Sequence, residues 1–215
     1  DGTKLAAITN PGYIWTSSDS GSNWTTGALT GAVQKARYWQ GIAMSSDGSK
    51  IAALEAVSGT GYSGPNLRAY VFNFDGSAAI SGFFREIVSS MSEWSTTTYT
   101  CIAMSSDGTK IAVTERGSGL GGYIYISRDS GNTWTQDTSI GSRKEFYSIS
   151  CSHDFTKLVA TVVHERTDPN PSNPGLDSLV KNVIWTSNDS GYTWTNDLEW
   201  PDSNHNYITS NISLS

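Results

Sequence analysis

The chain has 215 residues and a net charge of −6, which argues against nucleic acid or an anionic membrane surface as its main partner. An apolar fraction of 37% and eight tryptophans can supply a hydrophobic core, so the composition excludes a disordered polypeptide. No stretch of sequence approaches the roughly 20 apolar residues that a membrane-spanning helix needs.

One phrase occurs four times along the chain. It reads DGTKLAAI from residue 1, DGSKIAAL from 47, DGTKIAVT from 107 and DFTKLVAT from 154. An apolar run such as CIAMSS leads into the D-G-T-K turn, and a second apolar run follows it. An alternating stretch such as GYIYIS comes next, then a second turn and a run such as WTQDT. This order predicts four short strands in each unit and no long helix.

Repeated four-stranded antiparallel units predict an all-β protein, a β-propeller in which each unit forms one blade. We expect residues 1–215 to form a single propeller unit with repeats starting at 1, 47, 107 and 154. The final ISLS (212–215) matches the first strand of a unit, and the chain opens just after that strand. Either the last strand pairs with the first unit and closes a four-bladed ring, or the chain is a segment of a longer propeller. Closure would remove exposed sheet edges, which favours the ring.

A second phrase occurs three times, as SSDSGSNW at 17–24, SRDSGNTW at 127–134 and SNDSGYTW at 187–194. Its aspartate can accept hydrogen bonds from the turn backbone, its glycine can adopt positive φ, and its tryptophan can pack between sheets. The octets resemble the Asp-box, or bacterial neuraminidase repeat, of sialidases, sortilin-type receptors and secreted propellers. The second unit, YVFNFDGSAAISGFF, lacks the serine and the tryptophan.

The resemblance implies that the boxes are structural hairpins at the propeller rim, remote from any active site. The box residues to which it assigns this role are Ser17, Asp19, Gly21, Trp24, Ser127, Asp129, Gly131, Trp134, Ser187, Asp189, Gly191 and Trp194. Sialidases also need an R-I-P-type segment, an arginine triad and six blades, none of which this sequence matches. We therefore predict no catalytic residue, no cofactor and no metal site.

Three glutamates follow the second strand of their units at similar positions, namely Glu55, Glu115 and Glu165. Two carboxylates at a suitable separation could act as an acid/base pair in glycoside hydrolysis. The simpler interpretation is a set of rim carboxylates, or partners for Arg116 and Arg166, and we favour it.

Length variation is concentrated in the connections between the second and third strands, from TNPGY in the first unit to HERTDPNPSNPGLDSLVKN in the fourth. Long irregular loops on a rigid scaffold usually carry binding. Aromatic residues in these loops and between units are therefore candidate ligand contacts: Trp39, Tyr62, Trp94, Tyr99, Tyr147 and Trp200. Such rings suit the faces of sugars, although the same rings could pack between blades.

The sequence thus predicts a non-enzymatic, secreted or cell-surface propeller that acts as a scaffold or interaction module. It would bind a glycan or protein partner on its loop-rich face, or assemble with further copies or blades. The alternative is a fragment of a sialidase-like, glycan-processing hydrolase. The sequons at Asn23, Asn188 and Asn211 are compatible with a glycoprotein. Cys101 and Cys151 form either one disulfide or, as we favour, two buried thiols.

Overall fold

A computed structural model of the chain describes residues 2–26, 36–57, 66–74, 85–87, 101–115, 121–141, 144–166 and 180–201. Within these ranges the regular secondary structure consists of fourteen β-strands. No helix in them is long and apolar enough to cross a membrane.

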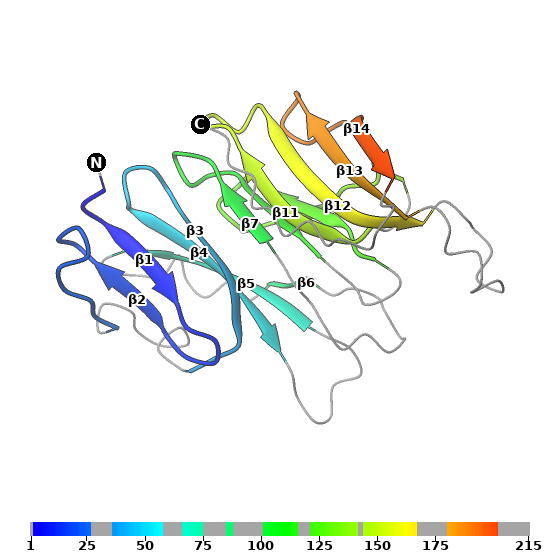
Figure 1. The fold of residues 1–215 in the computed structure, drawn as a ribbon. Helices are drawn as coiled ribbons and strands as arrows, with labels where there is room; N and C mark the ends of the chain where they lie inside the picture. Colours follow the sequence, from blue (N-terminus) through cyan, green and yellow to red (C-terminus); the bar gives the residue numbers. More distant parts are fainter. Residues whose placement is uncertain are drawn as a thin grey trace.

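The strands form four antiparallel sheets in chain order (Figure 1). The first sheet contains β1 (Leu5–Ile8) and β2 (Ile14–Ser17). The second contains β3 (Trp39–Met44), β4 (Lys50–Val57), β5 (Asn66–Asn73) and β6 (Arg85–Ile87). The third contains β7 (Cys101–Met104), β8 (Ile111–Thr114), β9 (Ile124–Ser127) and β10 (Thr135–Gln136). The fourth contains β11 (Phe146–Cys151), β12 (Leu158–Arg166), β13 (Val180–Ser187) and β14 (Thr195–Pro201).

The strand register repeats from sheet to sheet. In every unit the aliphatic residue after the D-G-T-K lysine pairs with a residue at or next to the end of the outgoing alternating strand. The pairs are Leu5 with Ser17, Ile51 with Phe72, Ile111 with Ser127 and Leu158 with Ser187. Phe72 therefore stands where the other units have their box serine, and it is buried. The second unit replaces a polar turn residue with a core residue.

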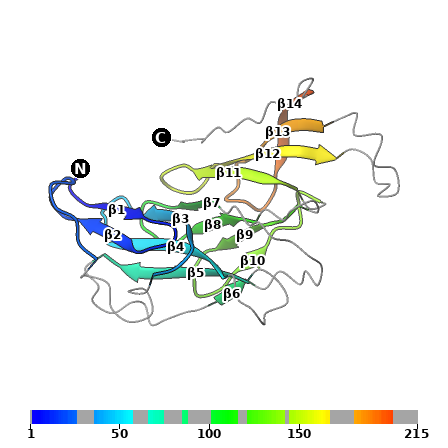
Figure 2. The ribbon, with the colours of Figure 1, turned by 60° about the horizontal axis from the view of Figure 1, so that its bottom comes forward.

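The hydrophobic core lies between consecutive sheets, which follow one another as a stack (Figure 2). One cluster joins Ile14 of the first sheet to Trp39 and Phe72 of the second. A second joins Leu54 to Ile111 of the third sheet, and the largest runs from the third sheet to the fourth. No core cluster of the described residues joins the first sheet to the fourth.

The expectation of an all-β chain built from four antiparallel sheets is confirmed. Closure of the ring is not seen, because the described strands do not form a closed barrel, and β1 has only β2 beside it in its sheet. The terminal segment 212–215, which we expect to pair with the first unit, lies outside the described residues.

Candidate functional site

The three octets form closely similar hairpin turns. In the third unit the Ser127 hydroxyl donates a hydrogen bond to Asp129 Oδ1 (2.9 Å) and accepts one from the Gly131 amide (2.8 Å). Asp129 also accepts hydrogen bonds from the backbone amide and the hydroxyl of Thr133, at 2.8 and 2.6 Å. The serine and the aspartate therefore satisfy donors of their own turn.

The other two octets repeat these bonds, with Ser17, Asp19 and Asn23 in the first unit and Ser187, Asp189 and Thr193 in the fourth. Each octet is also tied to the D-G-T-K turn of its own unit. The amides of Ser20, Ser130 and Ser190 donate to the carbonyls of Thr3, Thr109 and Thr156. The two turns of a unit thus form one hydrogen-bonded edge, which we call the turn edge.

The box carboxylates are held in the ionised form. Hydrogen bonds from Asn23 lower the pKa of Asp19 to about 2, and those from Thr193 lower the pKa of Asp189 to about 2. At Asp129 burial raises the pKa, but hydrogen bonds from the turn outweigh it and the pKa falls overall. A carboxylate stabilised in this way does not donate a proton near neutral pH, so the boxes are poorly suited to general acid catalysis.

The box tryptophans differ in burial because they differ in the contacts that they make with the preceding sheet. Trp194 is 7% exposed, belongs to the core between the third and fourth sheets, and donates its indole N–H to the Asp137 carboxylate. Trp134 is half-buried and packs against the core between the second and third sheets. Trp24 is 41% exposed. In the third and fourth units, therefore, the box joins its own sheet to the one before it.

The D-G-T-K turns form equally closed networks. In the second unit the Ser45 hydroxyl donates to Asp47 Oδ1 (2.7 Å) and accepts from the Lys50 amide (2.9 Å). The same pair of bonds occurs at Ser105, Asp107 and Lys110, and at Ser152, Asp154 and Lys157. The serine hydroxyls are the main cause that lowers the pKa of Asp47 and of Asp107 to about 2.

Neighbouring turns are bonded to one another across the sheets. The Ser46 amide donates to the Ser106 carbonyl, and the Ser106 amide donates to the His153 carbonyl, both at 2.9 Å. Two ammonium groups reach the following turn, Lys4 to the Asp47 carbonyl (3.3 Å) and Lys110 to the Asp154 carbonyl (3.4 Å). Hydrogen bonds along the turn edge therefore join neighbouring sheets.

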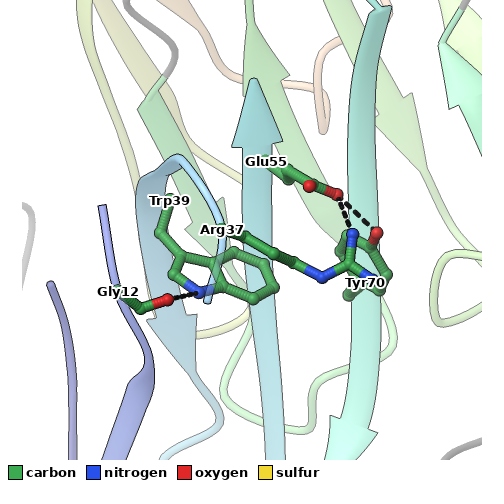
Figure 3. A network of polar contacts seen from close by, with 5 residues as sticks. All are labelled: Gly12, Arg37, Trp39, Glu55 and Tyr70. Carbon is green, nitrogen blue, oxygen red and sulfur yellow. Dashed lines mark hydrogen bonds and ion pairs between the residues drawn. The ribbon is translucent and has the colours of Figure 1, made fainter. Parts of the chain in front are cut away.

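The far end of β4 carries a buried polar network (Figure 3). Glu55 Oε2 lies 2.6 Å from Arg37 Nη1 and accepts a hydrogen bond from the Tyr70 hydroxyl at 2.5 Å. The Arg37 guanidinium also lies over the Tyr70 ring, 5.1 Å from its centroid. Trp39 packs edge-on against Tyr70 and donates its indole N–H to the carbonyl of Gly12, in the connection between β1 and β2 (3.1 Å). Glu55 thus acts as the structural partner of Arg37 where the first two sheets meet.

Glu115 occupies the corresponding position in the third sheet. It is 5% exposed, and the Tyr125 hydroxyl lies 3.5 Å from its Oε2. In the fourth sheet the register places Val162 at this position, and Glu165 lies three residues farther along β12, beyond a register shift. The sequence-based grouping of Glu165 with Glu55 is therefore wrong.

Among the candidate ligand-binding aromatics, the structure describes the side chains of Trp39 and Tyr147, and neither is exposed. Trp39 is 1% exposed and packs in the core, so its ring offers no face to a ligand. Tyr147 is half-buried at a register irregularity of β11. Trp200 lies in β14, opposite Asn182. The remaining candidates, Tyr62, Trp94 and Tyr99, lie outside the described residues.

Two exposed tyrosines that the sequence analysis did not select lie beside the Gly12–Arg37 bridge. Gly12 and Arg37 exchange backbone hydrogen bonds of 2.9 and 2.8 Å, and Tyr13 and Tyr38 follow them in the chain. Tyr13 is 41% and Tyr38 49% exposed. Side chains alternate along paired strands, so both tyrosines project away from the half-buried Arg37 side chain. The sequence signal for an exposed Tyr38 is the alternation of side chains along a strand, because a buried Trp39 places its neighbour Tyr38 on the opposite face.

Both cysteines are free and half-buried. The Cys101 thiol donates to the Tyr147 carbonyl (2.9 Å), and the Cys151 thiol donates to the Met104 carbonyl (3.3 Å). Burial raises the pKa of both thiols, that of Cys151 to about 11. These thiols join β7 and β11, the first strands of neighbouring sheets, and are poorly suited to act as nucleophiles.

The sequons differ in accessibility. Asn188 is exposed, whereas the Asn23 side-chain amide donates to Asp19 Oδ2 (2.7 Å), and Asn211 lies outside the described residues. In the part of the chain that the structure describes, no group of three or more His, Cys, Asp or Glu residues is arranged to hold a metal ion.

No protein-family model matches the chain, and no curated protein matches it in sequence. Solved structures are similar in fold. A GH74 enzyme from Niastella koreensis matches with 18% identity and a TM-score of 0.54, over 91% of this chain and 28% of that one. A GH74 xyloglucanase from Xanthomonas campestris matches with 14% identity and a TM-score of 0.53, over 92% and 28%.

The β-propeller domain of Cps50 (Swd1) from Myceliophteria thermophila also matches, with 10% identity and a TM-score of 0.52, over 94% of this chain and 57% of that domain. These neighbours are propeller proteins, so the chain has a β-propeller type of fold. The chain spans little more than a quarter of the GH74 enzymes that it matches.

Proposed function

We propose that this chain is a non-enzymatic Asp-box propeller that acts outside the cell as a glycan-binding interaction module. The observation that carries the proposal is the difference between its two edges. On the turn edge the carboxylates and hydroxyls bond within their own turns, while backbone amides and lysines join neighbouring sheets. The opposite edge presents Tyr13 and Tyr38 to solvent.

The Asp-box assignment is supported by the recurrence of one hydrogen-bond pattern in three octets. Each octet follows the outgoing strand of a hairpin, and in each the serine hydroxyl bonds both the aspartate and the glycine amide. The exposed Asn188 sequon supports a secreted location.

A non-enzymatic role is supported by the state of the carboxylates. Glu55 is buried and paired with Arg37, while Asp19 and Asp189 accept several hydrogen bonds within their turns. Retaining and inverting glycosidases instead need two carboxyl groups that flank an accessible substrate.

A glycan partner is supported by the chemistry of the exposed tyrosines. A tyrosine ring offers an apolar face for the C–H side of a sugar, and its hydroxyl can hydrogen-bond a sugar hydroxyl. Tyr13 and Tyr38 lie close together across the Gly12–Arg37 bridge, as diagonal neighbours of an antiparallel pair do. Asn10, in the same hairpin as Tyr13, adds an exposed amide.

A glycan array tests the proposal directly. The parent chain should bind a defined set of glycans, and the Tyr13→Ala/Tyr38→Ala double variant should lose that binding at least tenfold. Tyr192→Ala is the matched control, because Tyr192 is 65% exposed but lies on the turn edge. Binding that survives the double variant, or a parent chain that binds only proteins, would reject the proposal. Hydrolysis of the arrayed glycans would favour the glycan-processing fragment instead.

A further inference from the structure

The box of the first sheet lacks the contact that buries the box of the fourth. Trp194 inserts its ring against the third sheet and bonds Asp137, and it is 7% exposed. Trp24 holds the same place in its octet but is 41% exposed. Within the described residues, the Trp24 indole N–H has no acceptor from another sheet.

The box glycines show the same difference. A Cβ added to Gly191 would lie 2.2 Å from Ile126 of the third sheet, and one added to Gly131 would lie 2.7 Å from Val71 of the second. A Cβ added to Gly21 would meet only its own sheet and octet, with Leu5 at 3.4 Å. The first sheet thus presents a complete box whose docking surface is not covered by any described sheet.

The fourth sheet presents the complementary half of the contact. Asp137, which accepts the Trp194 indole, follows Trp134 by three residues, and Asp197 follows Trp194 by three residues in the same way. Asp197 is exposed, and the hydroxyls of Thr186 and Thr195 donate to its carboxylate. An acceptor equivalent to Asp137 is therefore held on a surface that no described sheet covers.

We propose that this chain associates head to tail, with the fourth sheet of one copy docked on the first sheet of another. Asp197 of one copy then accepts the indole N–H of Trp24 of the next, which repeats the junction between the third and fourth sheets. Within one copy the two surfaces lie at opposite ends of the stack (Figure 1), so neither covers the other. Because the two surfaces differ, the contact is heterologous and can extend beyond a dimer.

Sedimentation velocity of the 215-residue chain over a range of concentrations tests this association. We expect species larger than the monomer, and a loss of association of at least about 30-fold in Trp24→Ala, the size typical of a central aromatic contact. Asp197→Ala should weaken association as well. Tyr192→Ala, which removes an exposed aromatic outside the interface, should associate like the parent chain, and so should the Tyr13→Ala/Tyr38→Ala variant that tests glycan binding.

Mixing the two interface variants gives the sharpest result. Trp24→Ala retains an intact fourth sheet and Asp197→Ala retains an intact first sheet, so an equimolar mixture should form a heterodimer that cannot extend. Trp24→Phe keeps a ring but removes the N–H donor, and it serves if the alanine variant does not fold. A parent chain that is monomeric at every concentration would overturn the proposal. The box of the first sheet would then be covered either by closure of the ring or by a different chain. Failure of the mixture to form a heterodimer would overturn it as well.

Discussion

Gly191 lies where the fourth octet meets the third sheet, and replacing it measures how closely the two are packed. Its φ is +81°, and an added Cβ would lie 2.2 Å from Ile126 Cδ1. Holding alanine in the left-handed region costs about 1–2 kcal/mol, and forcing a methyl group into a packed interface costs about 1–3 kcal/mol more. We therefore expect Gly191→Ala to lower the free energy of unfolding by about 2–5 kcal/mol.

Gly141→Ala is the matched control, because Gly141 has a φ of +84° and its Cβ would meet nothing within 4 Å. Gly141→Ala should lower the free energy of unfolding only by the cost of holding alanine in the left-handed region, about 1–2 kcal/mol. Urea-induced unfolding followed by tryptophan fluorescence measures both variants, and thermal unfolding should separate their midpoints by roughly 2–12 °C. Equal losses in the two variants would refute the packing of the octet against the preceding sheet.

Three further predictions follow from the other networks. The folded pKa of Asp189 is about 2, below its ordinary value of 3.8, so its bonds stabilise the fold above pH 4 and are lost as the pH falls toward 2. Asp189→Asn should therefore destabilise at pH 7 but differ little from the parent in urea unfolding at pH 2, and a difference that is independent of pH would contradict this. Arg37→Leu should cost about 3–5 kcal/mol, because it strands the buried Glu55 carboxylate, and adding Glu55→Leu should recover much of the loss. If the double variant is as unstable as the single one, the ion pair is not the cause. Cys101 and Cys151 should react slowly with an aromatic disulfide at pH 8 in the folded protein and rapidly in urea, and rapid reaction of the folded protein would contradict their burial.

The local turns are the part of this molecule that sequence reasoning describes best. Ser127, Asp129 and Gly131 lie within five residues of one another, so the bonds among them depend on little beyond their own spacing. The strand order of a unit is similarly local, since each turn joins two adjacent apolar runs. For these reasons the all-β class and the repeated sheets can be predicted from the sequence.

Burial of a particular aromatic ring depends on the neighbouring sheet, which sequence spacing does not report. Trp24 and Trp194 occupy equivalent places in nearly identical octets, yet one is 41% and the other 7% exposed. Trp39 is inaccessible and its neighbour Tyr38 is exposed, because strand alternation turns the two rings to opposite faces. Glu165 differs, because its displacement can be read from the sequence. It lies eleven residues after Asp154, whereas Glu55 lies eight after Asp47, and Val162 takes the position of Glu55.

Hydrogen exchange of two backbone amides tests most directly whether the turn edge joins the sheets. The Ser46 and Ser106 amides lie in surface turns and are bonded only through carbonyls of the following unit, Ser106 and His153, each at 2.9 Å. Such a bond protects an amide as long as the two sheets stay together. We predict that both amides exchange slowly in the folded chain, at a common rate that increases in Gly191→Ala. Exchange at the rate of an unstructured peptide would show that the turns do not connect the sheets.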